Sequence, residues 1–227
     1  MLSYVLQYPL RKYLRYSLIG KTSMILYTDA TTPFGRKCLV AALERNIALE
    51  ERFVNLSDPQ EFLFVNPLNQ IPALSVGQQN YFDSDVILQF LDTLHKGPPL
   101  ISKRNKYKHL TSLHLANAVI ESTLLRIMEK RRVETEQSSG FISHLEERIN
   151  RGIAEMEDTR LEEIGEFLSG EELTTAIALS YVDFRFTKNW RAKAPRLSNW
   201  HAIIEQRSSM ICSQPNRTQP THSPARV

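Results

Sequence analysis

Two hydroxyl residues, Thr31 and Thr32, stand immediately before Pro33 in the segment TTPFGRK. Proline suits the first position of a helix, because the N–H that it lacks would have no partner there. The apolar residues that follow recur at helical spacing, so a helix is predicted from Pro33. A hydroxyl beside the positive end of a helix can donate to an anion, or it can simply cap the helix. Both uses stay open.

A second pair of chemically useful residues, Asp83 and Ser84, precedes another apolar helical run, SDVILQFLD. At a helix N-terminus, Ser84 would combine a hydroxyl, a backbone N–H and the positive end of the helix dipole, which suits a carboxylate. Asp83 can accept from an ammonium group. Taken alone, however, such a dipeptide is more often a plain helix cap.

Short strands and helices alternate around these residues. We expect strands at 24–28, 49–55, 71–74 and 81–82, and helices from Pro33 to about Asn46, near Pro59 after a cap at Ser57 or Asp58, and from Asp83 or Ser84 to about Leu94. The order βαβαββα is the layout of a thioredoxin-type domain.

Beyond residue 96 the pattern changes to helices only. The segment 97–106, with Gly97 and two prolines, indicates a linker. Helices are predicted around 110–124, from about Phe141 to Leu168, from Ser169, which has the S-x-x-E spacing of a capping box, and over 195–207. The predicted domains are therefore 24–96 and a helical domain at 107–211, with a disordered tail at 212–227. Residues 1–23 are basic and lack carboxylates, so they are interpreted as a flexible extension or, alternatively, as a targeting peptide or an amphipathic surface-binding segment.

Composition excludes several classes of protein. Four basic residues before residue 23 account for the net charge of +3, and the dispersed charges that remain do not form the basic face of a nucleic-acid binder. No segment is apolar enough over about 18 residues to cross a membrane. The two cysteines are far apart and the six histidines lack paired ligand spacing, so we expect neither a disulfide framework nor a metal site, and a reducing cytoplasm.

Four segments, taken in order, resemble the glutathione transferase family of bacteria. TPFGRK, NPLNQIPAL and FDSDVILQFLD are similar to its three glutathione-site segments, and TAIALSYVDFRF with the downstream PRLSNWHAIIEQR is similar to its helical C-terminal domain. The likeness covers roughly residues 24–211. It implies an α/β thioredoxin-like domain followed by an all-α domain, and glutathione as co-substrate without a tightly bound cofactor.

The resemblance assigns roles to the residues already noted. It implies that Ile71 pairs its backbone with the cysteinyl part of glutathione, that Pro72 is cis, and that Gln70 donates to a ligand carboxyl group. Asp83 and Ser84 would hold the γ-glutamyl group, and Phe34 would line the same site. Asn69 stands where the family commonly has glycine, and asparagine tolerates the positive φ that glycine would adopt.

Activation of the thiol is assigned to Thr32, with Thr31 as the alternative, because a hydroxyl near the helix start can stabilise the thiolate of bound glutathione. A redox enzyme would need cysteine in place of Thr32. Cys38 lies more than a turn into the helix, away from its activating end, so we expect a buried structural thiol.

The second substrate is expected to meet the helical domain, with Asn117, Arg126 and Arg131 as candidates for its wall. Trp190, Trp200 and Tyr181 are expected in the core. For Arg36 and Lys37 two interpretations stay open. They could attract the anionic ligand or pair with carboxylates across a dimer, or they could be solvated helix charges.

The predicted function is conjugation of glutathione to small electrophiles in detoxification, with peroxide reduction as a further activity, by a cytoplasmic homodimer. The alternative is a non-catalytic module of the same family that carries ligands or binds proteins.

Overall fold

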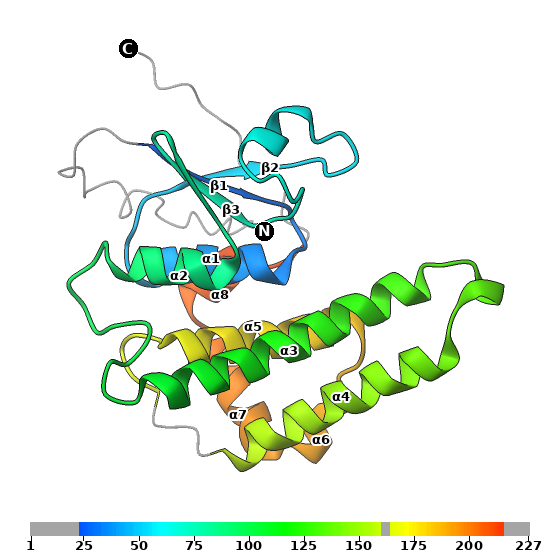
Figure 1. The fold of residues 1–227 in the computed structure, drawn as a ribbon. Coiled ribbons are helices and arrows are strands. Elements are labelled where there is room, and N and C mark those ends of the chain that lie inside the picture. The colour runs from blue at the N-terminus through cyan, green and yellow to red at the C-terminus, as the bar shows by residue number, and fades with distance from the viewer. Residues whose placement is uncertain (1–22, 160–163, 216–227) are drawn as a thin grey trace, which may run out of the picture.

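The computed structural model describes residues 23–159 and 164–215, and Figure 1 shows a β-sheet layer above a bundle of helices. The predictions for residues 1–22, for Leu161 and for residues 216–227 lie outside the described residues.

The sheet has four strands in the order β2-β1-β3-β4. The strands are β1 (Met24–Thr28), β2 (Glu50–Phe53), β3 (Ala73–Val76) and β4 (Gln79–Phe82). β1 runs parallel to β2 and antiparallel to β3, where Leu26 pairs with Leu74, and both of these side chains are fully buried. β3 and β4 form a hairpin. The predicted thioredoxin-like order of strands and helices is confirmed.

Two helices, α1 (Pro33–Glu44) and α2 (Ser84–Asp92), cover the face of the sheet that is turned toward the bundle (Figure 1). α1 begins at Pro33, as predicted. It packs so closely on β1 that a Cβ atom built on Gly35 would overlap the hydroxyl of Thr28, so only glycine fits there.

The helix predicted near Pro59 is a 3₁₀ turn, η2 (Gln60–Phe64). Pro59 itself occupies the cap position and no side chain caps the turn. The expected cap at Ser57 or Asp58 was therefore wrong.

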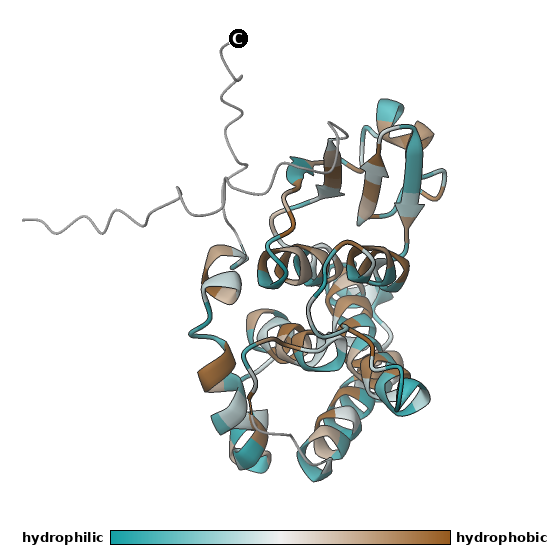
Figure 2. Cartoon of the chain, turned by 90° about the vertical axis from the view of Figure 1, so that its left-hand side faces the viewer, coloured by the Kyte–Doolittle hydropathy of each residue, from teal (hydrophilic) through white to brown (hydrophobic). Residues whose placement is uncertain are grey.

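The bundle consists of six described helices and one 3₁₀ turn. They are α3 (Lys106–Lys130), η3 (Glu134–Glu136), α4 (Ser139–Asp158), α5 (Gly170–Arg185), α6 (Trp190–Lys193), α7 (Pro195–Ile204) and α8 (Ser208–Cys212). α5 is buried along most of its length, and Figure 2 shows the surrounding helices with polar and apolar faces. The Ser169–Glu172 capping box that opens α5 is confirmed.

Two predicted boundaries in the bundle were wrong. The helix expected to reach Leu168 ends at Asp158, because Thr159 adopts an extended conformation. The tail predicted from residue 212 begins too early, since Cys212 is the last residue of α8 and Ser213 is fully buried.

Basic side chains of α1 connect the sheet domain to the bundle. Lys37 is fully buried and its Nζ binds Asp85, at the start of α2, and Oδ1 of Asn117 on α3 at 3.0 Å. Arg36 donates to the hydroxyl of Ser213 and to the carbonyl of Met210, both at 3.2 Å. The interpretation of Arg36 and Lys37 as solvated helix charges was wrong, because both side chains are buried.

A carboxylate of α1 also connects the sheet domain to the bundle. Glu44 accepts from Arg207 at 2.6 Å and from the hydroxyl of Ser209 at 2.5 Å. Burial alone would raise the pKa of Glu44. The hydrogen bonds from Arg207 and Ser209, together with the charge of Arg207, outweigh burial and lower this pKa.

We predict that Lys37→Met lowers the free energy of unfolding in urea by about 3 kcal/mol, because it leaves Asp85 and Asn117 without their cationic partner. This is the low end of the range for a broken buried pair, since the side chain of Asp85 is 33% exposed. Adding Asp85→Leu should restore at least half of the loss. The exposed Lys130 on α3 serves as the control, and Lys130→Met should change little. Equal losses for Lys37→Met and Lys130→Met would contradict this role of the ion pair.

Candidate functional site

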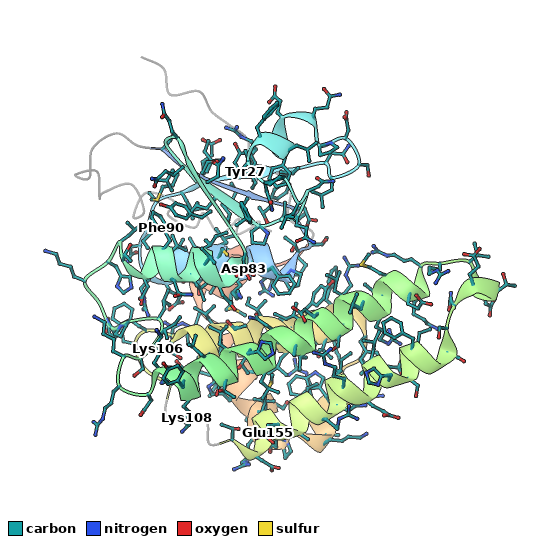
Figure 3. The ribbon with its side chains drawn as sticks, in the orientation of Figure 1. Tyr27, Asp83, Phe90, Lys106, Lys108 and Glu155 are labelled. Atoms are coloured by element: carbon teal, nitrogen blue, oxygen red, sulfur yellow. The ribbon has the colours of Figure 1, made fainter. Side chains whose placement is uncertain are left out.

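A cavity of about 760 Å³ lies between the sheet domain and the bundle. Its sheet-domain side is lined by three loops, at residues 29–34, 66–72 and 82–85, and its other side by residues of α3 and α5. In Figure 3, Asp83 lies where α2 begins, on the side facing α3. All three segments that the sequence singled out for chemistry therefore meet at one cavity.

The first loop is organised by Asp29. Its Oδ1 accepts from the backbone N–H groups of Thr31 at 2.5 Å and Thr32 at 2.6 Å, and from the Thr31 hydroxyl at 3.1 Å. Thr32 is the residue that precedes the first turn of α1, but its side chain makes no capping hydrogen bond. Among the described residues, the hydroxyl of Thr31 is engaged, whereas that of Thr32 is free to donate.

The second loop is held by side-chain amides. Asn66 donates to the carbonyl of Gln70 at 2.6 Å, and Asn69 donates to the carbonyl of Leu56 at 3.0 Å. Asn69 has φ 52°, so it adopts the left-handed conformation expected where glycine is common. The loop thus keeps its shape without glycine.

The peptide bond between Ile71 and Pro72 is cis, as the resemblance implied. Strand β3 starts only at Ala73, and the N–H and C=O of Ile71 make no hydrogen bond within the described part of the chain. This peptide edge lines the cavity and remains available for pairing with an extended ligand.

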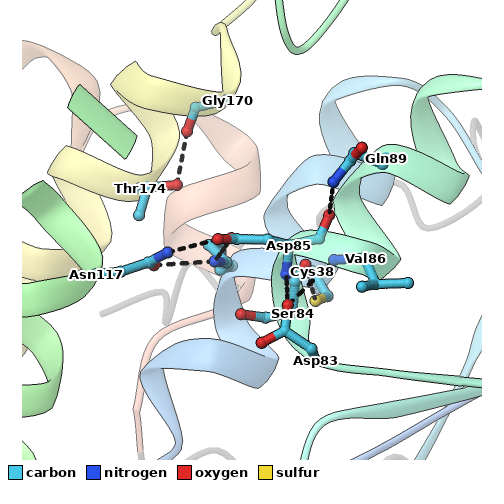
Figure 4. Close-up of polar contacts among 10 residues, drawn as sticks. Cys38, Asp83, Ser84, Asp85, Val86, Gln89, Asn117, Gly170 and Thr174 are labelled. Atoms are coloured by element: carbon cyan, nitrogen blue, oxygen red, sulfur yellow. Dashed lines mark hydrogen bonds and ion pairs between the residues drawn. The ribbon is translucent and has the colours of Figure 1, made fainter. Parts of the chain in front are cut away.

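The third loop begins α2. Oδ1 of Asp83 accepts from the backbone N–H groups of Asp85 at 2.8 Å and Val86 at 3.2 Å, so Asp83 is the helix cap (Figure 4). Ser84 follows as the first residue of the helix, with only 6% of its surface exposed, and both residues line the cavity. The cap uses one carboxylate oxygen and leaves the Ser84 hydroxyl without a described partner.

Cys38 lies behind this loop and does not line the cavity. Its thiol contacts the carbonyl oxygen of Ser84 at 3.7 Å (Figure 4). Burial raises the pKa of Cys38 to about 12, which outweighs the lowering effect of Lys37. The prediction that Cys38 is a buried thiol is confirmed.

The helical wall only partly matches the three candidates from the sequence. Arg131, at the end of α3, lines the cavity. Asn117 also lines it, but its amide is engaged by Lys37 and, at 2.8 Å, by Asp85. Arg126 was a wrong prediction: it binds Glu146 of α4 at 2.6 Å, outside the cavity.

Sequence reasoning missed two residues of α5, Tyr181 and Arg185, which line the cavity one helical turn apart. Tyr181 is 5% exposed, so the expectation of burial was right, but the residue also lines the cavity. Trp190 and Trp200 are buried in the core as predicted. The signal that could have found the pair is their i, i+4 spacing, which places both residues on one face of the helix.

Within residues 23–159 and 164–215, no three His, Cys, Asp or Glu side chains converge to hold a metal ion. Across the same stretches, no helix combines the length and the apolar character that crossing a membrane requires.

Known proteins share this arrangement. Residues 26–99 match a family model described as "Glutathione S-transferase, N-terminal domain". The "Uncharacterized GST-like protein YibF" of Escherichia coli (strain K12) is 24% identical over 205 residues, which cover 85% of this chain and 98% of that protein.

Two solved structures from Pseudomonas fluorescens Pf-5 are similar over nearly the whole of their chains. A glutathione transferase family member with bound glutathione has a TM-score of 0.79 and 29% identity, covering 86% of this chain and 100% of that one. A second, with bound S-(propanoic acid)-glutathione, has a TM-score of 0.77 and 28% identity, covering 86% and 99%.

Proposed function

The chain belongs to the glutathione transferase family, and from its site we propose that it binds reduced glutathione in the cavity between its two domains and transfers it to small electrophiles. The observation that carries this proposal is the convergence of Thr32, Ile71 and Ser84 on one cavity. The Pseudomonas fluorescens relative that holds S-(propanoic acid)-glutathione supports it, because that ligand is a glutathione thioether.

In this proposal, α2 receives the γ-glutamyl end of glutathione. The Ser84 hydroxyl and the first N–H groups of the helix bind the α-carboxylate, aided by the positive end of the helix dipole. Oδ1 of Asp83 is committed to the cap, so its second oxygen is the one that meets the ammonium group. Gln70 lines the cavity from the neighbouring loop and donates to another carboxyl group of the ligand.

The cysteinyl part then pairs with the free peptide edge of Ile71, beside Pro72, with Phe34 of the first turn of α1 lining the same cavity. This places the sulfur near the start of α1, where Thr32 offers a free hydroxyl. A thiol of pKa about 8.5 is mostly protonated at pH 7, so a donor to the thiolate increases the reactive form. The free hydroxyl favours catalysis over the alternative of a non-catalytic carrier.

The reaction needs no further co-reactant. The thiol gives its proton to solvent, the sulfur forms a bond to the electrophilic carbon, and the leaving group departs with the electron pair of the bond that breaks. The protein binds and orients the thiolate and stabilises its charge.

We predict that Ser84→Ala weakens glutathione binding roughly 10- to 150-fold in isothermal titration calorimetry, because a hydrogen bond to a charged group contributes about 1.5 to 3 kcal/mol. Ser139 is the matched control, since it is also the first residue of a helix but is exposed on α4. Ser139→Ala should bind like the wild type. An unchanged affinity in Ser84→Ala would refute the assignment of the γ-glutamyl site.

For thiol activation we predict that Thr32→Val raises the pKa of bound glutathione by about 1 to 2 units, measured by thiolate absorbance. Thr31→Val should have a smaller effect, because its hydroxyl donates to Asp29 rather than to the ligand. A rise in Thr31→Val alone would reverse the roles. If neither variant changes the pKa, the activator is the helix end itself and the hydroxyl role is excluded.

We also propose a symmetric homodimer, in which the sheet domain of one copy packs against the helices of the other. Large apolar side chains are exposed on both parts: Phe64 (89% exposed) and Leu63 near the sheet, and Val133 and Phe141 in the bundle. Such residues, when they cluster, mark contact surfaces.

Light scattering should therefore give about twice the 26.2 kDa of one chain at micromolar concentration. Phe64→Asp, which places a charge on the contact, should shift the mass toward one chain, and a monomeric wild type would disprove the dimer.

A further inference from the structure

The helical side of the cavity differs in chemistry from the sheet side. Leu124, Ile127 and Met128 of α3 provide an apolar surface, and Arg131 and Arg185 provide cationic groups at its end. The volume of about 760 Å³ is within the range of pockets that enclose a drug-sized ligand. With glutathione on the sheet side, this wall faces the space left for the second substrate.

Neither arginine of this wall has a carboxylate partner among the described residues. Other arginines of the bundle do: Arg126 pairs with Glu146 and Arg207 with Glu44. In addition, Nε of Arg185 is buried without a hydrogen-bond partner, while its guanidinium stacks on Phe184 at 4.0 Å. A buried donor without a partner is costly, so its retention at a cavity points to an acceptor on a ligand.

Tyr181 adds a hydroxyl to the same place. It lies one turn before Arg185 on α5, and a side-chain hydrogen bond joins the two residues, so that Arg185 and Tyr181 form one polar group next to Arg131. Burial raises the pKa of Tyr181, and the two arginines oppose this effect only in part. The phenol therefore stays protonated near neutral pH and can donate a hydrogen bond.

None of the acidic residues that line the cavity forms an ion pair with Arg131 or Arg185. Asp29 accepts from the Thr31–Thr32 loop and its charge also acts on Tyr181, Asp83 caps α2, and Asp85 binds Lys37 and Asn117. Glu121 lies ten residues before Arg131 on the same helix, which corresponds to about 15 Å along its axis.

We propose that the electrophile conjugated by this protein carries a carboxylate, held by Arg131, Arg185 and the Tyr181 hydroxyl, with its reacting carbon directed toward the glutathione sulfur. Each guanidinium offers paired N–H donors that match the two oxygens of a carboxylate, and the phenol adds a single O–H donor. This inference rests on the proposed function, because it assumes glutathione on the sheet side.

The chemical class is a small carboxylic acid with a leaving group, such as a halide, on the reacting carbon. The carbon–sulfur bond forms as the carbon–halogen bond breaks, and the halide leaves with the bonding electrons. The carboxylate is unchanged in the reaction and serves only for recognition.

Two glutathione thioethers test this inference without relying on turnover. S-(2-carboxyethyl)glutathione and its neutral amide, S-(2-carbamoylethyl)glutathione, have nearly the same shape, and their affinities are compared by calorimetry on the full chain. The carboxylate should bind roughly 10- to 100-fold more tightly to the wild type, as expected for charge-assisted hydrogen bonds. In Arg131→Met/Arg185→Met the two affinities should become similar, while glutathione itself binds as before.

Arg132 provides the matched control, because it follows Arg131 but lies outside the cavity, on the surface beside Glu129 and Glu136. Arg132→Met should keep the preference for the carboxylate.

Three outcomes have distinct meanings. Equal affinities for the two thioethers in the wild type overturn the inference but leave glutathione binding intact. A loss of glutathione affinity in the double variant also overturns it, since the arginines would then hold glutathione itself. If the wild type binds neither glutathione nor the thioethers, the proposed function fails as well.

Discussion

The relative positions of α1, α2 and α3 around the cavity depend on one buried cation, the ammonium group of Lys37. An ammonium group without water must be paired, and in this chain its partners are Asp85 at the start of α2 and Asn117 on α3. Figure 4 shows that these two partners also bind each other. A residue of α1 thereby fixes the first turn of α2 and, at the same time, the helix that forms the far wall of the cavity. Because Ser84 immediately precedes Asp85, the contact that joins the domains also positions the proposed carboxylate site.

Two helix N-termini consequently face the same cavity. α1 begins beside Thr32, and α2 begins at Ser84, with its cap at Asp83. Each end carries about half a positive charge, so both favour anions. In the proposed mode of binding, one end meets the thiolate and the other meets the γ-glutamyl carboxylate of glutathione. Arg131 and Arg185 place further positive charge on the opposite wall, where they would bind the carboxylate of the electrophile.

The parts of this site that the sequence predicted are those set by local patterns. Pro33 marks a helix start, and Asp83 with Ser84 marks another, because caps and first turns involve only neighbouring residues. The roles of Lys37 and Arg185 could not be predicted in this way, since they depend on which side of a helix faces another element. One signal for Lys37 was present: the six residues that follow it, 38–43, are all apolar, which is typical of a helix that is buried on every side.

Recognition of the γ-glutamyl carboxylate by the start of α2 is tested most directly by calorimetry of the wild-type protein with two thiols. One is glutathione and the other is cysteinylglycine, which has the same thiol but lacks the γ-glutamyl group. We predict that cysteinylglycine binds at least about 100-fold more weakly, because it cannot make the charge-assisted hydrogen bonds at Ser84. Equal affinities for the two thiols would contradict this recognition.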